Sequence, residues 1–513
     1  MIADIRTLPD GSTVSADLVI IGGGMAGLAL AREWAGAEKT VLILEAGGRE
    51  HEDETQALYA GAARLADGAG TEREIDDYLI ESRVRRYGGS SHWWGGKCAP
   101  LDPADFAPRP WVKHSGWPMT REDLQPFYDR ACDALSIPHF DKDYNEMQHE
   151  GRPPLRINGA RHVESLPRDY SPVTSYAGTP HFEEFLYGFT GADNISAYLN
   201  ANAVDFHLND DRSRLDSIGV ATLDGKRYTA RGSVFILACG GIENARLLLA
   251  ANARNGARFG ERSNALGRYF QGHTVIFRER GEDGAGTFLH VTAPSESLSL
   301  YTDRGLEAPH AVLGATLAGQ ETYQAPAFTV TFELESDAAA AADERALRAM
   351  AAKVDRGDPA AVGDQSHWCY YMSENHPNPQ SRITLTDETD ALGVPKINLR
   401  WEYGADDLDG FEHSFNAFVR ELGISGTGRA SCPIERDNLI NAMMPSRHHI
   451  GTTRMHADPS IGVVDPDLRC HDTENLYIAG SSVFPTSGIA NPTLTIIALA
   501  LRLSDHLKQR LGG

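Results

Sequence analysis

A strongly apolar run near the start of the chain leads directly into three spaced glycines. Residues 18–21 (Leu-Val-Ile-Ile) precede Gly22, Gly24 and Gly27 in a G-x-G-x-x-G pattern, and residues 28–34 continue as an alanine- and leucine-rich segment. A continuous apolar run of this kind is typical of a strand buried on both faces of a parallel sheet. The pattern therefore predicts a strand, a tight turn and a helix in succession, as at the start of a doubly wound α/β fold.

The glycines of such a turn let the backbone approach a pyrophosphate, and the N–H groups of Met25 and Ala26 then face that anion at the positive end of the helix dipole. A second apolar run ends in Glu45, 18 residues after Gly27, with Ala46 next. This offset is close to the roughly 20 residues at which a carboxylate accepts hydrogen bonds from a ribose. Because an acid there would repel a 2′-phosphate, the pattern predicts a dinucleotide without one.

Almost 470 residues separate this turn from the end of a second candidate cofactor segment. An apolar strand at 475–479 leads to Gly480 and Ser481, and Asn491-Pro492-Thr493 (491–493) precedes a long apolar helix. Proline at a helix start loses no hydrogen bond, and the positive end of the helix dipole can face the edge of a flavin that gains negative charge on reduction. Together the two segments indicate a flavoenzyme.

Length and charge bound the class of protein. A chain of 513 residues is too long for one ordinary core, so we expect two or more domains. Lys and Arg total 48 against 71 Asp and Glu, a formal net charge of −23, which disfavours nucleic acid and anionic membranes as partners. The N-terminus lacks a signal-peptide pattern, and no run of 18 apolar residues occurs. We therefore expect a cytoplasmic protein without a membrane span.

The six cysteines are scattered without a C-x-x-C pair or a haem-attachment motif. They are typical of isolated thiols in a reducing compartment, and the sequence predicts no metal site.

Further strands predict a discontinuous cofactor domain. Residues 194–204 and 226–230 read as strands, and 233–239 reads as a buried strand followed by a helix from 243 to 249. Alternating strands at 327–333, 382–385 and 397–401 predict an antiparallel sheet in a second, α+β domain. The alanine-rich segment 338–353 is predicted as an exposed helix or a loop without chemistry. The expected division is a cofactor domain at 1–100, 195–280 and 446–513, and a substrate domain at 101–194 and 281–445.

Several motifs, in this order, resemble those of the glucose-methanol-choline (GMC) oxidoreductases, and most closely the pyranose 2-oxidase and glycoside 3-oxidase branch. Besides the first glycines with Glu45, they are Gly88 to Gly96, Ala238 to Arg246, His448 to Met455, and Ile478 to Thr495. The resemblance implies a Rossmann-like FAD-binding domain, an interleaved substrate domain, and reoxidation by dioxygen or a quinone-type acceptor. It also implies a larger cofactor site, made of Gly22, Gly24, Met25, Ala26, Gly27, Glu45, Ala46, Gly89, Ser90, Ser91, Trp93, Trp94, Gly95, Val204, Cys239, Gly480, Ser481, Asn491, Pro492 and Thr493.

Oxidation of an alcohol requires loss of the hydroxyl proton, and a neutral imidazole is a suitable base because its pKa of about 6.5 lies near working pH. His448 and His449 are adjacent candidates, and neighbours on an extended segment point in opposite directions. The family pattern H-x-x-G-T-x-x-M selects His448. The resemblance also implies that Asn491, 43 residues later, is the partner of that base. An amide can donate to and accept from a hydroxyl, but it cannot take its proton.

The segment around His92 bears on how the flavin is held. In fungal pyranose 2-oxidases a histidine in an S-T-H-W context bonds covalently to the flavin, and Ser90-Ser91-His92-Trp93 (90–93) resembles it. Alignment on Gly88 and Gly89, however, places Trp93 at the linking position. We therefore expect non-covalent FAD, with a covalent link through His92 as the less favoured alternative.

The predicted reaction is oxidation of a secondary hydroxyl, C3 or else C2, of a pyranose or glycoside, with C3 preferred because an anomeric substituent crowds C2. Two alternatives are a dehydrogenase that needs a partner electron acceptor and a non-redox lyase on the same fold. Sugar rings bind aromatic faces. Six aromatic residues are candidates for such contacts, although core packing explains them equally well: Tyr87, Trp93, Trp94, Trp368, Tyr370 and Tyr371.

Overall fold

The computed structural model describes residues 1–137, 139–140, 163–166, 180–276, 290–292, 312–333, 366–424, 429–431, 436 and 439–512. The alanine-rich segment 338–353 lies outside these ranges. Among the described helices, none has an apolar stretch long enough to cross a bilayer.

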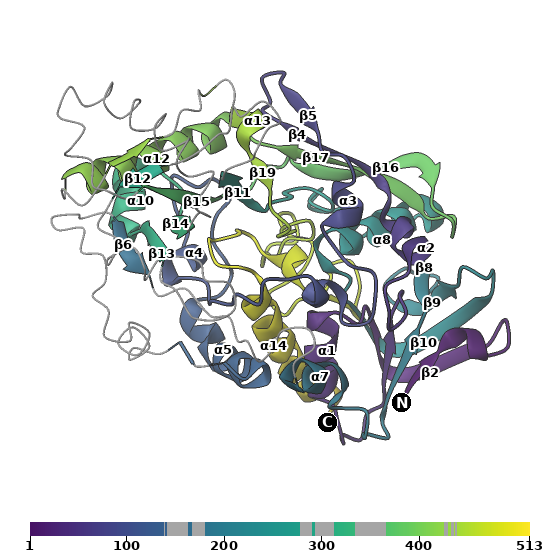
Figure 1. The fold of residues 1–513 in the computed structure, drawn as a ribbon. Helices are drawn as coiled ribbons and strands as arrows, with labels where there is room; N and C mark the ends of the chain where they lie inside the picture. Colours follow the sequence, from purple (N-terminus) through teal and green to yellow (C-terminus); the bar gives the residue numbers. More distant parts are fainter. Residues whose placement is uncertain are drawn as a thin grey trace.

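One of the two eight-stranded sheets of the described chain is mostly parallel and joins strands from both ends of the sequence (Figure 1). Its order is β1 (Ile2–Asp4), β7 (Ile195–Leu199), β3 (Val41–Leu44), β2 (Thr13–Ile21), β10 (Arg227–Leu237), β9 (Leu215–Ala221) and β8 (Asn202–Leu208), with β20 (Leu476–Ile478) paired to β10. Neighbouring strands run parallel along the order β1, β7, β3, β2 and β10, and β20 runs parallel to β10. In contrast, β9 pairs antiparallel with both β10 and β8. This arrangement confirms the predicted doubly wound α/β fold.

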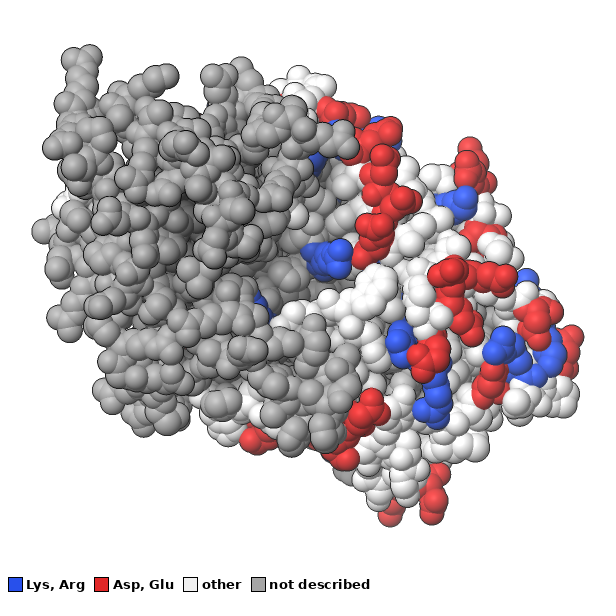
Figure 2. Space-filling view, viewed as in Figure 1, with Lys and Arg blue, Asp and Glu red and all other residues white. Residues whose placement is uncertain are grey.

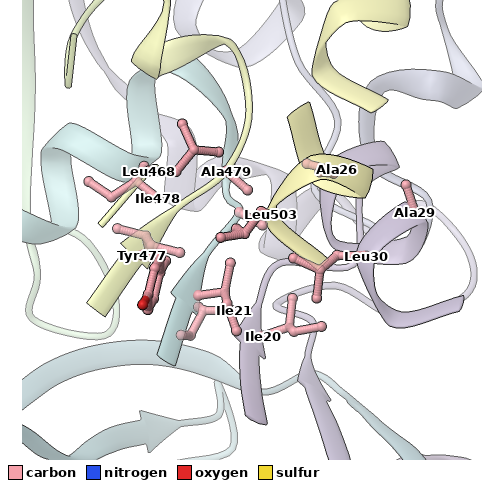
Figure 3. Close-up of a cluster of buried hydrophobic side chains, with 14 of the residues drawn as sticks. Ile20, Ile21, Ala26, Ala29, Leu30, Leu468, Tyr477, Ile478, Ala479 and Leu503 are labelled. Carbon is pink, nitrogen blue, oxygen red and sulfur yellow. The ribbon is translucent and has the colours of Figure 1, made fainter. Parts of the chain in front are cut away.

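Helices from distant parts of the sequence cover one face of this sheet. Figure 1 shows α1 (Met25–Arg32), α5 (Arg121–Leu135), α7 (Pro180–Tyr187) and α14 (Thr493–Leu511) grouped together. The buried cluster in Figure 3 joins Ile20 and Ile21 of β2, Leu30 of α1, Tyr477 of β20 and Leu503 of α14. Burial of these apolar side chains fixes the C-terminal helix against the first helix of the chain.

A second sheet, mainly antiparallel, forms the other half of the molecule. Its strands are β18 (Arg429–Ser431), β12 (His290–Thr292), β15 (Ser366–Glu374), β14 (Phe328–Glu333), β13 (Val312–Ala315) and β6 (Val163–Leu166), with β11 (His273–Ile276) paired to β15 and to β19 (Met444–Pro445). The long helix α12 (Ala405–Ile424) packs Phe411 and Phe415 against Tyr371 of β15, and α10 (Leu317–Tyr323) contacts α12. The expected antiparallel sheet is therefore present.

A third, smaller sheet has the order β16 (Arg382–Thr389), β17 (Pro395–Glu402), β4 (Gly61–Ala66) and β5 (Glu72–Glu74). The strands predicted at 382–385 and 397–401 pair here as an antiparallel hairpin. Because β4 and β5 come from the first 100 residues, this sheet connects ranges that the sequence assigns to different domains. The domain boundaries stay a prediction.

The remaining helices among the described residues are α8 (Gly240–Asn255) and several short helices. These short helices are η1 (Ile5–Thr7), α2 (Asp53–Gln56), η2 (Ala57–Tyr59), α3 (Tyr78–Glu81), η3 (Gly89–His92), α4 (Pro103–Phe106), α13 (Leu439–Ala442) and η7 (Ser481–Val483).

Two strand predictions were wrong in detail. Residues 194–204 do not form one strand, because Asn200 has a positive φ of 58° and turns the chain between β7 and β8. Asparagine tolerates this left-handed conformation better than most residues. Conversely, residues 227–230 of the predicted strand 226–230, and residues 233–237, belong to the single long strand β10.

Candidate active site

A cavity of about 650 Å³ lies where the carboxyl ends of the parallel strands meet the second sheet. All of the predicted cofactor residues line it except Gly27 and Val204, and so does His448. Val204 packs in a small core cluster instead, while Ala201 and Ala203 face the cavity. Figure 2 shows a hollow near the centre of the view that contains basic side chains, beside a described surface on which acidic and basic groups are interspersed.

In the glycine turn (residues 22–27), each of the three motif glycines is favoured over a larger residue for a different steric reason. Gly22 has a φ of +107°, and a Cβ there would lie 2.5 Å from the carbonyl oxygen of Ala238. A Cβ on Gly27 would lie 2.1 Å from the carbonyl oxygen of Gly22, so this glycine allows α1 to pack closely on the turn. A Cβ on Gly24 would meet no atom within 4 Å and would take up cavity space.

Gly24 is also the N-cap of α1, and no side chain caps this helix. The first N–H groups of the helix therefore retain their hydrogen-bonding capacity at the cavity wall, where the helix dipole favours an anion.

Glu45 extends from the end of β3 into the same region. Its two carboxylate oxygens accept hydrogen bonds from the backbone N–H groups of Gly23 (2.7 Å) and Gly47 (2.8 Å). Each oxygen keeps a further lone pair for a hydroxyl donor. Burial raises the pKa of this carboxyl above its usual range, against the hydrogen bonds that lower it.

The C-terminal segments form the facing wall. Gly480 has a φ of +109° with open space at its Cβ position, and the hydroxyl of Ser481 donates to the carbonyl of His449 at 2.6 Å. Helix α14 begins at this wall without a side-chain cap. The amide of Asn491 donates to the Lys97 carbonyl at 3.3 Å.

Asn244 of α8 forms hydrogen bonds with two segments that are far apart in the sequence. Its oxygen accepts from the backbone N–H of Cys239 at 2.7 Å, and its amide donates to the carbonyl of Ala479 (3.1 Å) and the hydroxyl of Ser482 (2.9 Å). One buried amide therefore holds the β10–α8 turn against the turn that follows β20.

A buried ionic cluster borders the cavity and was not predicted from the sequence. Glu243 lies within 3.4 Å of the guanidinium groups of Arg83, Arg85 and Arg246. Burial alone would raise the pKa of Glu243, but the three cations outweigh it and lower that pKa to about 2. Arg83 and Arg85 also lie over the ring of Tyr59 and line the cavity. This wall is therefore positively charged.

His448 follows the short strand β19 and is half-buried at the cavity surface. Its Nδ1 lies 2.8 Å from Nδ1 of His273, whose Nε2 lies 3.0 Å from the carbonyl oxygen of Gly488. Burial lowers the pKa of His448 to about 4, so the ring is neutral at neutral pH. A neutral imidazole beside a cavity can act as a proton acceptor.

His449 also borders the cavity but is more deeply buried. Its ring packs edge-on against Tyr78 and near Phe270. Burial, followed by the charge of Arg83, lowers its pKa well below the usual value. The two histidines therefore have different surroundings, as expected for neighbours that point in different directions.

His92 does not line the cavity. Its Nε2 faces the carbonyl oxygen of Tyr87 at 2.9 Å, and its ring packs edge-on against Phe182. The following residues do reach the cavity: the side chain of Trp93 is half exposed, whereas Trp94 packs against the main core.

The aromatic residues that were candidates for sugar contacts separate into two groups. Tyr370 lines the cavity, as do Trp93 and Trp94. Tyr371 and Tyr87 are buried in the core, so the interpretation of these two as sugar contacts was wrong. Successive strand residues face opposite sides, which explains the difference between Tyr370 and Tyr371. The side chain of Trp368 lies outside the described part of the structure.

Several buried polar atoms on cavity residues have no hydrogen-bond partner among the described residues. They are Oγ of Ser82, Nε of Arg85, Nε of Arg86, Nε1 of Trp94 and Nε2 of His449. Buried polar groups are normally paired, so these atoms fit a polar group bound in the cavity. The uncapped helix ends, the Glu45 carboxylate and these donors together suit a dinucleotide with a diphosphate and a ribose.

Sequence reasoning missed His273. It begins a buried strand of four residues, and its distance of 175 residues from His448 gives no local signal. The antiparallel pairing of β11 with β19, and the antiparallel bridge between Gln271 and Ile450, bring the two segments together.

Comparison with known proteins agrees with this geometry. Residues 377–500 match the family model described as GMC oxidoreductase. The chain is 24% identical to the fructose dehydrogenase large subunit of Gluconobacter japonicus over 96% of this chain and 98% of that protein. It is 25% identical to a C-glycoside 3-oxidase of Microbacterium trichothecenolyticum over 57% of this chain and 50% of that one. The fold is similar to that of a formate oxidase, with a TM-score of 0.58, 18% identity, and coverage of 98% and 99% of the two chains.

Proposed function

Because the chain is an FAD-binding oxidoreductase of the GMC family, acting on hydroxyl groups, we propose that it oxidises a secondary hydroxyl of a pyranose sugar or glycoside. The observation that carries the proposal is a neutral histidine, His448, on the same cavity as the glycine turn. A proton acceptor and a redox cofactor site on one cavity are what this reaction requires.

FAD bound in the cavity would supply the acceptor for a hydride from the substrate carbon, to be reoxidised by dioxygen or a quinone-type acceptor. The glycine turn and the uncapped start of α1 would hold its diphosphate, and Glu45 its adenosine ribose. Gly480 and Ser481 border the same space from the opposite wall. The positive end of α14 at Pro492 and Thr493 would stabilise negative charge on the flavin ring.

His448 would take the proton of the substrate hydroxyl, because a neutral imidazole has one nitrogen that can accept. Asn491 would hold the hydroxyl by donating and accepting hydrogen bonds without taking its proton. These roles follow from the family pattern, and they are supported by the presence of both side chains at one cavity.

We place the oxidation at C3 in preference to C2. Its support is the similarity to a C-glycoside 3-oxidase and the crowding of C2 by an anomeric substituent. Tyr370, Trp93 and Trp94 offer aromatic surface to a flat aglycone, at about 25 cal/mol per Å² of buried apolar area before ordering costs. We therefore expect a higher kcat/KM for phenyl β-glucoside than for glucose. A preference for glucose with a 2-keto product would contradict this assignment.

Anaerobic flavin reduction tests the reaction itself. Purified holoenzyme is mixed with a panel of free sugars and glycosides, and bleaching of the flavin absorbance is followed. Oxidation predicts bleaching with at least one member and a keto-sugar product identified by NMR. Turnover of a substrate with a fully oxidised flavin would instead indicate lyase chemistry.

Variants of the two adjacent histidines test the assigned base. We expect His448→Ala to slow flavin reduction by roughly 10²–10⁴-fold while FAD stays bound. His449→Ala serves as the control and should retain much more of the rate. The reverse result would transfer the role of base to His449.

A second candidate function is a dehydrogenase that passes its electrons to a partner protein. It is favoured by the match to nearly the full length of a protein named as the large subunit of a dehydrogenase. Steady-state turnover of the isolated chain with dioxygen, compared with turnover with a soluble quinone, separates the two. Rapid flavin reduction with no turnover on either acceptor would favour the dehydrogenase that needs a partner protein, whereas turnover with the soluble quinone would exclude it.

A further inference from the structure

His273 is a buried neighbour of His448 and contacts its Nδ1 atom. It is the first residue of β11, its side chain is fully buried, and its backbone N–H donates to the hydroxyl of Ser446 at 2.8 Å. The hydroxyl of Tyr78 donates to the carbonyl of the same serine. The segment that carries His448 is therefore fixed to β11 by the hydrogen bond to Ser446 and by the pairing of β11 with β19, and the two imidazole rings meet edge to face.

The partners of His273 determine which nitrogen of each ring carries hydrogen. The carbonyl of Gly488, 3.0 Å from Nε2 of His273, can only accept, so this Nε2 carries a hydrogen. In an uncharged ring the other nitrogen, Nδ1, is then an acceptor. Nδ1 of His448 lies 2.8 Å from it and must donate. The uncharged pair therefore leaves Nε2 of His448 without a hydrogen and with a lone pair.

We propose that His273 is a positioning residue that holds His448 in the tautomer with hydrogen on Nδ1, and so makes Nε2 the proton acceptor for the substrate. The proposal rests on the proposed function, in which His448 is the base. It adds a residue that acts through His448 and touches no substrate itself.

The carbonyl that fixes the tautomer is itself held in place. The backbone N–H of Gly488 donates to the Glu374 carboxylate at 3.1 Å, and this carboxylate forms a buried ion pair with Arg109. Gly488 also has a φ of +57°, and a Cβ there would lie 2.5 Å from Leu101. The position of the carbonyl is thus set by an ion pair and by close packing, and a histidine behind it has one preferred orientation.

The same contacts can accommodate the transferred proton. When the substrate hydroxyl gives its proton to Nε2 of His448, the pair gains one positive charge. The hydrogen between the two Nδ1 atoms can then move to His273, which keeps its hydrogen bond to the Gly488 carbonyl. A charged pair has a stronger hydrogen bond than a neutral one, so His273 favours the proton-transfer product.

Two substitutions of His273 separate positioning from packing. His273→Leu retains apolar volume but removes both nitrogen atoms, which frees His448 to adopt the other tautomer. His273→Gln retains one acceptor and one donor. We expect the rate of flavin reduction per bound flavin, measured with the best sugar of the panel, to fall roughly 10- to 100-fold in the leucine variant and to be largely restored in the glutamine variant.

The melting temperature and the FAD content of both variants are measured in parallel. A merely structural role would lower these two quantities and leave the rate per bound flavin unchanged, and that result would overturn the proposal. Equal rates in the leucine and glutamine variants would also overturn it.

Nitrogen-15 NMR of histidine-labelled protein tests the tautomer without turnover, and it remains decisive if the leucine variant does not fold. The signals of His448 are those lost in His448→Ala. The proposal requires a protonated Nδ1 and an unprotonated Nε2, and the opposite pattern would refute it. If His448→Ala reduces its flavin at the full rate, the proposed function fails, whereas the NMR pattern still decides the tautomer.

Discussion

Arg109 and Glu374 form a two-pronged ion pair in the interior of the protein, with Nη1 2.7 Å from Oε2 and Nη2 2.6 Å from Oε1. Both side chains are almost completely buried. The pair joins the loop after α4 to the end of β15, and through Gly488 it reaches the loop that precedes Asn491. It thereby links the second sheet to the loop after α4 and to the loop at Gly488, whose carbonyl oxygen contacts His273.

Removal of one partner should destabilise the fold strongly. We expect Glu374→Gln to cost about 3 kcal/mol, because it removes the hydrogen-bonded counter-charge of the buried Arg109 guanidinium and leaves only the Asp105 carboxylate, 3.8 Å away. The matched control is Lys113→Ala, which breaks an exposed ion pair with Asp406 of similar length. Thermal and urea denaturation followed by circular dichroism measure both variants. Equal, small effects would show that the buried pair contributes no more than a surface pair.

The reaction rate should be independent of pH across the neutral range. Burial lowers the pKa of His448 to about 4, and the base must be unprotonated to act. The rate constant of flavin reduction should therefore stay constant above about pH 5 and fall as the pH decreases through the lowered pKa, rather than near the ordinary value of about 6.5. Stopped-flow reduction at several pH values measures this. An inflection near pH 6.5 would contradict an effect of burial on His448.

Two glycines of the same turn should respond differently to alanine. In Gly24→Ala the new methyl group meets no atom within 4 Å, so the apoprotein should keep its melting temperature but bind FAD more weakly. In Gly27→Ala the methyl group would lie 2.1 Å from the Gly22 carbonyl, so the fold itself should be destabilised. Thermal melts of the apoproteins and FAD titrations compare the two. Tight FAD binding by Gly24→Ala would place the diphosphate elsewhere.

Glu45 should contribute to FAD affinity through its charge. A hydrogen bond to a charged group is worth about 1.5–3 kcal/mol, so Glu45→Gln should weaken FAD binding by roughly 10- to 100-fold. Glu50→Gln is the control, because that side chain is exposed and does not line the cavity. Fluorescence titration of apoprotein with FAD provides the dissociation constants. Unchanged affinity in Glu45→Gln would remove Glu45 from the ribose site.

Denaturation should release the flavin into solution. Nε2 of His92 is directed at the Tyr87 carbonyl and away from the cavity, and Trp93 has no nucleophilic nitrogen suited to a covalent link. Acid precipitation followed by fluorescence of the pellet and the supernatant tests this. Flavin that remains in the pellet of the wild type, and leaves it in His92→Ala, would establish a covalent link through His92.

Local sequence patterns predicted the parts of the fold that depend on neighbouring residues. The strand, turn and helix around Gly22 are one such unit, and the hairpin of β16 and β17 is another. Strand boundaries failed at Asn200, where a left-handed residue interrupts an apolar alternation. Predictions of which strand residues face the cavity also failed, because neighbouring strand residues point to opposite sides. Ala203 lines the cavity in place of Val204, and Tyr370 does so without Tyr371.

The sequence predicted contacts within the site only where both contacting residues belong to the same local motif. Glu45 follows from its distance to the glycine turn, since both belong to one β–α–β unit. His273 and Glu374 do not, because their partners lie 175 residues away at His448 and 265 residues away at Arg109. Such pairs depend on which strands of the second sheet are neighbours, and an antiparallel sheet with long connections leaves no periodic signal of that choice.

The distance along the chain between the glycine turn and β20 has a consequence for biosynthesis. Leu503 and Tyr477, which pack in one cluster with Ile20 and Leu30, are made more than 450 residues after Ile20 (Figure 3). Until then β2 and α1 present apolar surface to solvent or to a chaperone. A nascent chain that stalls before β20 is therefore an aggregation hazard, and the cavity can be completed only after β20 and the start of α14 have been made.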